Sequence, residues 1–191
     1  QWVLEAETVS TLYHTVIGAG ETPVVWCHGV FGQGKNFTSV AKALVASDPH
    51  RWRAILLDLP NHGRSPWTDT MSYPQMSDAV ARTIHDLADG QPVHLLGHSM
   101  GGMTIMEYAR RFPEEFGEKV AGVGLVATSP GNLAQHSIVP GVPGPVFASL
   151  APHVITVFNR APGAFDRARR VGTDVGAVAT QRMAYGAIVA P

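Results

Sequence analysis

Short apolar runs separated by longer amphipathic stretches make up the chain as far as residue 128. Each apolar run is bounded by glycine, proline or charged residues, which is typical of a strand buried inside a sheet. A partly alternating pattern between residues 2 and 16 indicates an amphipathic hairpin or two edge strands. We predict buried strands over residues 22–27, 54–58, 92–96 and 120–127.

Apolar residues between these runs recur at the spacing of one helix face. The clearest example is the set Met76, Val80, Ile84 and Leu87. We predict helices over residues 36–46, 74–88 and 103–111. Because strands and helices alternate, we predict an α/β fold with a mostly parallel sheet and helices on both faces.

The pattern changes after residue 128. Pro-Gly pairs at 130–131, 140–141 and 143–144 interrupt any regular period. Two helix-like stretches of small and apolar residues follow, over 146–158 and 173–187. We therefore divide the chain into a core at 1–128 and the start of a helical insertion at 129–191, and we expect further core strands outside the chain.

Composition narrows the class of protein. A length of 191 residues, 45% of them hydrophobic, suits a globular domain with a core. The formal net charge of -1 argues against nucleic acid or an anionic membrane as the main partner. No window is long and apolar enough for stable membrane insertion and no signal peptide is visible, so we expect a cytoplasmic protein. The single cysteine, Cys27, excludes an internal disulfide and fits a buried strand thiol.

Residues 97–101 match the pattern G-x-S-x-G between the predicted strand at 92–96 and the predicted helix at 103–111. A serine hydroxyl is a weak nucleophile and has to project from a sharp turn for a base to reach it. Glycines two positions before and after Ser99 allow that turn to pack closely. The amide of Met100 then lies at a helix start, with a free donor for an oxyanion formed beside Ser99. The pattern predicts a nucleophilic serine in this turn at 97–101, which we call the elbow.

A glycine-rich loop at 28–34 predicts a second oxyanion donor. His28 and Gly29 directly follow the buried strand at 22–27. The backbone N–H of Val30, or that of Phe31, then lies where acyl transfer needs its second donor. Residues 58–65, which follow the next strand, match the pattern D-x-x-x-H-G-x-S.

Together these three segments resemble the α/β-hydrolase superfamily, in its branch of esterases, lipases and related serine hydrolases with a helical cap. The resemblance covers residues 22–127 and continues more loosely to 191. It implies that Ser99 is the nucleophile and that the amides of Met100 and Val30 form the oxyanion hole.

The resemblance also implies supporting roles for neighbouring residues. His28, Gly29 and His98 would shape the elbow and the oxyanion loop, and the turn at 58–65 would brace that loop from beside it. Phe31 either lines the acyl pocket or fills it, and the sequence favours neither. Met103 and Met106 are expected to pack in the core.

The reaction implied is acyl transfer: hydrolysis of a carboxylic ester through an acyl-enzyme on Ser99. The apolar insertion predicts a small hydrophobic or lipid-like ester as the partner, with no cofactor and no metal. The alternatives are a catalytically weak protein of this fold that binds a ligand or acts as a receptor, and a related perhydrolase, carbon-carbon hydrolase or acyltransferase.

The catalytic acid and histidine have no candidates of the right order. In this fold the acid follows the serine and the histidine follows the acid. After Ser99 the histidines are His136 and His153, and the acids before them lie on or just beyond the predicted elbow helix: Glu107, Glu114, Glu115 and Glu118. We therefore expect a segment beyond Pro191, or a second chain, to supply both groups. A natural short homologue that has lost catalysis is the alternative.

Two rival chemistries fit the sequence less well. Residues 29–36 nearly match the phosphate-binding loop G-x-x-x-x-G-K-[ST], but Asn36 replaces the hydroxyl residue that holds magnesium. The spacing of His28, His62 and His98 matches no metal-binding motif. Neither chemistry explains the elbow.

Overall fold

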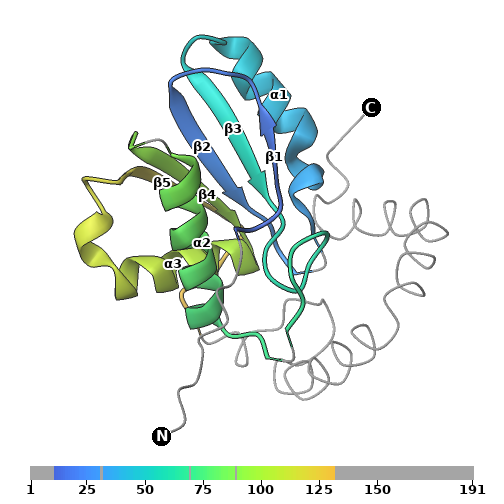
Figure 1. The fold of residues 1–191 in the computed structure, drawn as a ribbon, viewed down its shortest axis with the longest axis vertical. Helices are drawn as coiled ribbons and strands as arrows, with labels where there is room; N and C mark the ends of the chain where they lie inside the picture. The colour runs from blue at the N-terminus through green and yellow to red at the C-terminus, as the bar shows by residue number, and fades with distance from the viewer. Residues whose placement is uncertain (1–10, 31, 69, 89, 132–191) are drawn as a thin grey trace, which may run out of the picture. The chain divides into compact units, whose positions relative to one another are not determined.

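A computed structural model describes residues 11–30, 32–68, 70–88 and 90–131. They contain a five-stranded sheet in the order β1-β3-β2-β4-β5 (Figure 1). β1 runs antiparallel to β3, and the other neighbouring pairs are parallel. The strands are β1 His14–Ile17, β2 Thr22–Cys27, β3 Trp52–Leu57, β4 Val93–His98 and β5 Val120–Val126. The predicted mostly parallel sheet is confirmed.

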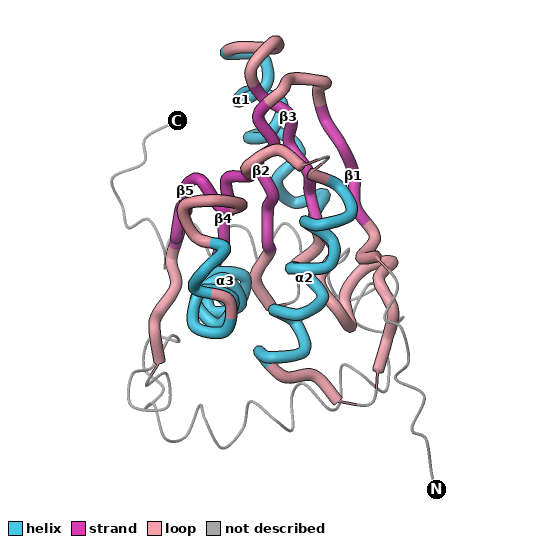
Figure 2. The backbone as a smooth tube through the Cα atoms, turned by 60° about the vertical axis from the view of Figure 1, so that its left-hand side comes forward, coloured by secondary structure: helices cyan, strands magenta, loops and turns pink. Residues whose placement is uncertain are grey.

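Helices cover both faces of this sheet, α1 on one side and α2 with α3 on the other (Figure 2). They are α1 Thr38–Ser47, α2 Tyr73–Leu87 and α3 Met100–Arg111, with short 3-10 turns η1 Gly34–Phe37 and η2 Pro113–Glu115. The helix predicted from residue 36 begins only at Thr38, because residues 34–37 form η1. α3 begins at Met100, as expected from the turn at Ser99, three residues before the helical stretch predicted at 103–111.

Two apolar layers hold the sheet between its helices. On one face Val25 and Leu95 pack beneath Ile105 and Tyr108 of α3. On the other face Trp26 packs against Ala41 of α1. β2 is therefore apolar on both faces, which is the pattern of an interior parallel strand. This strand is the support on which the site is built.

Some expectations fall wholly or partly outside the described residues. Of the region expected to form a hairpin or two edge strands, β1 is the described part, and it pairs with β3 as an antiparallel edge strand. The insertion expected over 129–191 lies outside the described residues except for 129–131, so the domain division stays a prediction. No helix in the described part of the chain is long and apolar enough to cross a membrane.

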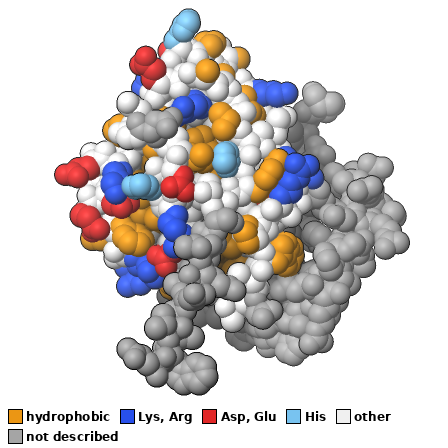
Figure 3. All heavy atoms as spheres, in the orientation of Figure 1, with side chains coloured by type: hydrophobic (Ala, Val, Ile, Leu, Met, Phe, Trp, Pro, Cys, Tyr) orange, Lys and Arg blue, Asp and Glu red, His pale blue; other side chains and the backbone are white. Residues whose placement is uncertain are grey.

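Acidic and basic side chains are interspersed on the face shown in Figure 3. Two of the ion pairs link Arg110 with Glu107, at 2.7 Å, and Arg111 with Asp78, at 2.8 Å. The second pair joins α3 to α2.

Candidate active site

Ser99 lies in a strained turn between β4 and α3. Its backbone angles are φ 51° and ψ -117°, a region that non-glycine residues rarely occupy. The Ser99 amide donates to the Val126 carbonyl at 3.0 Å, and the Ser99 carbonyl accepts from the Gly102 amide at 3.0 Å and from Thr128 Oγ1 at 2.7 Å. β5 and α3 thus hold the turn from both sides. This is the geometry that the G-x-S-x-G pattern predicts.

We did not predict the part that Thr128 plays. Besides its hydrogen bond to the Ser99 carbonyl, its side chain lies against Gly102, where an added Cβ would be 2.6 Å from Thr128 Oγ1. The only signal in the sequence is that Thr128 is the first polar residue after the strand predicted at 120–127.

Gly97 and Gly101, on either side of Ser99, pack so closely against other backbone atoms that no side chain fits at either position. A Cβ on Gly101 would lie 2.1 Å from the Cys27 carbonyl oxygen, and a Cβ on Gly97 would lie 2.6 Å from the Cα of Gly102. The start of α3 therefore rests directly on the backbone of β2. This contact explains why the helix begins at Met100 although glycine is a poor helix former.

Two backbone amides near the turn make no hydrogen bond within the described part of the chain. Met100 is the first residue of α3, and the backbone amides that donate to the Ser99 carbonyl are those of Gly102 and Met103. Among the described residues the amides of Met100 and Val30 have no acceptor. Free N–H groups near a nucleophile are what an oxyanion hole requires.

His28 shapes the oxyanion loop from inside. It is 1% exposed, its Nδ1 lies 2.7 Å from the Gly29 carbonyl, and its Nε2 accepts from the Leu59 amide at 2.9 Å. Because Nε2 accepts, the proton is assigned to Nδ1, which donates to Gly29. Burial lowers the pKa of His28 to about 4, so the ring is neutral near pH 7. The His62 ring lies 4.9 Å away, and burial lowers its pKa as well.

His98 borders the same loop. A Cβ on Gly29 would lie 2.9 Å from His98 Nδ1 and 3.1 Å from the Ser99 Cβ, so Gly29 lets the loop approach Ser99. His98 itself is half-buried. Phe31 lies outside the described residues.

No described residue supplies a base to Ser99. Within that part of the chain the Ser99 hydroxyl makes no hydrogen bond. Glu107 pairs with Arg110, and Glu115 pairs with Lys119 at 2.9 Å. His136 and His153 lie outside the described residues. The origin of the acid and the histidine stays a prediction.

The described residues also contain no group of three His, Cys, Asp or Glu side chains placed to hold a metal.

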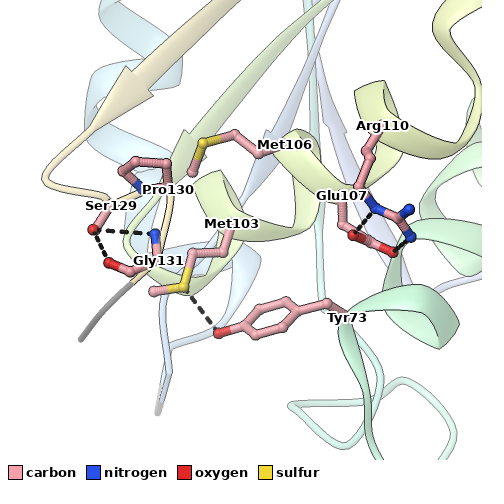
Figure 4. Close-up of a pocket in the computed structure, with 8 residues that line it drawn as sticks. All are labelled: Tyr73, Met103, Met106, Glu107, Arg110, Ser129, Pro130 and Gly131. Carbon is pink, nitrogen blue, oxygen red and sulfur yellow. Dashed lines mark hydrogen bonds and ion pairs between the residues drawn. The ribbon is translucent and has the colours of Figure 1, made fainter. Parts of the chain in front are cut away.

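A pocket of about 300 Å³ lies along α3, and Figure 4 shows the side chains around it. Tyr73 Oη donates to Met103 Sδ at 3.0 Å across the pocket. Met103 and Met106 are half-buried and line it, so the expectation that they pack in the core is wrong. The helix turns these two residues away from the sheet and toward the segment after β5. The lining residues are Tyr73, Met103, Met106, Glu107, Arg110, Ser129, Pro130 and Gly131.

The backbone contact at Gly101 predicts a loss of stability in Gly101→Ala. The new methyl group has to push α3 away from the Cys27 carbonyl, and we expect the free energy of unfolding to fall by about 1–3 kcal/mol. Gly124→Ala is the matched control, because its Cβ would meet Leu96 at an ordinary 3.6 Å. Chemical denaturation measures both. A Gly101→Ala protein as stable as its parent would show that α3 moves aside freely.

The low pKa of His28 predicts acid-sensitive folding. The unfolded chain takes up a proton near pH 6.5, whereas the folded ring takes it up only near pH 4. Stability therefore falls as the pH is lowered through this window, by up to about 3 kcal/mol from His28. Denaturant unfolding at pH 7 and pH 4.5 should give a smaller loss for His28→Asn than for the parent. Equal losses would contradict the burial of a neutral His28.

Comparison with known proteins agrees with this geometry. The sequence profile of the alpha/beta hydrolase fold matches residues 22–175. The sn-1-specific diacylglycerol lipase ABHD11 of Xenopus tropicalis is 45% identical over 92 residues, which are 48% of this chain and 28% of that protein. Its counterpart from Danio rerio is 37% identical over 133 residues, which are 69% of this chain and 40% of that protein.

Among solved structures, a marine microorganism esterase is 31% identical, with a TM-score of 0.58 over 69% of this chain and 46% of that one. The chain thus spans less than half the length of each of these three relatives. Since the family profile covers most of the chain, and the sheet, the elbow and the glycine contacts agree with it, the chain belongs to the α/β-hydrolase fold family.

Proposed function

We propose that this chain carries the nucleophile of a serine hydrolase that cleaves carboxylic esters of hydrophobic or lipid-like substrates. The observation that carries the proposal is the strained turn at Ser99, close to the amides of Met100 and Val30, which have no acceptor among the described residues. A hydroxyl next to backbone donors that have no acceptor among the described residues is suited to attack on a carbonyl group.

In the proposed reaction Ser99 Oγ attacks the ester carbonyl carbon and passes its proton to a histidine supplied from outside the described residues. The carbonyl oxygen becomes an oxyanion and accepts from the amides of Met100 and Val30. The carbon–oxygen bond to the alcohol then breaks, and the alcohol leaves with the proton from the histidine. Water adds to the acyl-enzyme in the same way and releases the acid.

Two observations support an apolar substrate. The pocket beside α3 is lined by Met103 and Met106, and the Met103 amide bonds the Ser99 carbonyl at 3.2 Å, so the pocket begins within one helical turn of the nucleophile. The relative from Xenopus tropicalis, which is 45% identical over 92 residues, is named as an sn-1-specific diacylglycerol lipase. Flexible thioether side chains pack well against an acyl chain.

A ligand-binding protein of this fold is the second candidate. The observation in its favour is that no base contacts the Ser99 hydroxyl in the described part of the chain. Binding alone needs the pocket but not the activated serine.

Ser99→Ala separates the two candidates. In the full-length protein we expect a fluorophosphonate probe to form one adduct, mapped to Ser99 by peptide mass spectrometry. Ser99→Ala should remove that adduct and lower ester turnover at least about 10³-fold. Ser39→Ala, an exposed serine on α1, should change neither. Turnover that survives Ser99→Ala would refute the hydrolase proposal, and ligand binding without any adduct would favour the second candidate.

The methionine side chains that line the pocket predict a preference for longer acyl chains. Each buried methylene contributes about 0.8 kcal/mol, so kcat/KM for a p-nitrophenyl decanoate should exceed that for the acetate at least about 10-fold. Met103→Gln, which keeps the side-chain length but adds a polar amide, should reduce this ratio. Met71→Gln is the control, since Met71 is exposed and lies outside the pocket. Equal ratios in parent and Met103→Gln would exclude this pocket as the acyl site.

A further inference from the structure

Asp58 is a buried carboxylate that serves backbone amides. It is 5% exposed; its Oδ1 accepts from the Gly34 amide at 2.8 Å, and its Oδ2 accepts from the Arg64 amide at 2.9 Å. Within the described residues it forms no ion pair with a cationic side chain. Burying a carboxylate without a counter-charge is costly, so these two hydrogen bonds have to compensate for lost hydration.

The Gly34 amide is the far end of the oxyanion loop at 28–34. The near end is held by His28, whose Nε2 accepts from the Leu59 amide. Both ends of the loop are therefore tied to the two consecutive residues Asp58 and Leu59, which follow β3. The loop is therefore held at both of its ends by one neighbouring segment, residues 58–59.

Between the two ends of this loop, a tight turn contains Val30. The Gly29 carbonyl accepts from His28 Nδ1 and from the Gly32 amide at 2.9 Å. The Val30 side chain is 40% exposed, so packing of that side chain contributes little to the position of its backbone. The backbone around Val30 is therefore held by this turn and by the hydrogen bonds at the two ends of the loop.

The segment that carries Asp58 is itself rigidly built. Ser65 Oγ donates to the Asp58 carbonyl and accepts from the Tyr13 amide at 2.9 Å. Gly63 has φ +55°, and a Cβ there would lie 2.0 Å from Asp58 Oδ2. Only glycine at this position lets the Arg64 amide reach the carboxylate.

We propose that Asp58 is a positioning residue for catalysis: by holding the Gly34 amide it aims the Val30 N–H at the oxyanion, without touching the substrate. This inference rests on the proposed ester hydrolysis. The resemblance implies a brace at 58–65 in general terms, and the hydrogen bonds identify which group does the bracing and on which part of the reaction it acts.

Asp58→Asn is the sharpest variant, because it keeps the volume of the side chain. Its amide offers one acceptor and turns an NH₂ group toward the other backbone N–H, so either Gly34 or Arg64 loses its partner. An oxyanion donor acts mainly in the transition state, so kcat should fall while KM changes by less than about 2-fold. Losing a donor outright costs about 10²–10³-fold, and misdirecting one should cost about 10–100-fold in kcat.

The test uses the full-length protein and two inhibitors with the same acyl chain. A trifluoromethyl ketone adds to Ser99 and forms an oxyanion, whereas the corresponding ether binds without one. In Asp58→Asn we expect ketone affinity to fall by the same factor as kcat and ether affinity to stay unchanged. Asp78→Asn makes the same chemical change at the ion pair with Arg111 between α2 and α3, and should keep all three values.

Two results would overturn the proposal. One is an Asp58→Asn protein with parental kcat and ketone affinity. The other is a parallel loss of ketone and ether affinity, which indicates general damage to the site. If Asp58→Asn does not unfold cooperatively, His28→Asn takes its place, since its shorter side chain can still donate to Gly29 but has no acceptor at the position of Nε2 that Leu59 uses. Parental kcat in that variant shows that the loop at 28–34 needs no support from residues 58–59, and this also overturns the proposal. A parent with no Ser99-dependent turnover refutes the proposed function instead, before any variant is compared.

Discussion

The contact between the first turn of α3 and the backbone of β2 is the constraint on which the site depends. At Gly101 the helix and the strand are so close that a single Cβ would overlap the Cys27 carbonyl. Because the helix starts there, the chain has to reverse within one residue after β4, and that residue is Ser99 with its positive φ. The free amide of Met100 is a consequence of the same arrangement, since the first amides of a helix have no partner within it.

A second constraint concerns protonation. His28 accepts at one ring nitrogen and donates at the other, which only the neutral ring can do, and its burial favours that form. Asp58 accepts from one backbone amide at each of its two oxygens. The loop beside Ser99 thus depends on a buried neutral imidazole and on a buried carboxyl group that accepts from backbone donors.

Sequence patterns predicted the elements well where local chemistry decides the structure. The apolar run at 22–27 coincides with β2, and the helix predicted at 74–88 differs from α2 by one residue at each end. The turn at Ser99 and the helix start at Met100 were predicted because this turn needs glycines at defined spacing on either side. The pocket position of Met103 and the role of Thr128 were missed because each depends on a contact between segments distant in sequence. The partners of Asp58 are backbone amides, so no side-chain identity reveals them.

The hydrogen bond from Thr128 to the Ser99 carbonyl divides the backbone that follows β5 into two parts. Thr128 is fixed to the turn at Ser99, and residues 129–131 line the pocket along α3. Substitutions at residues 129–131 can therefore change the lining of the pocket, while the hydrogen bond of Thr128 keeps the turn at Ser99 in place.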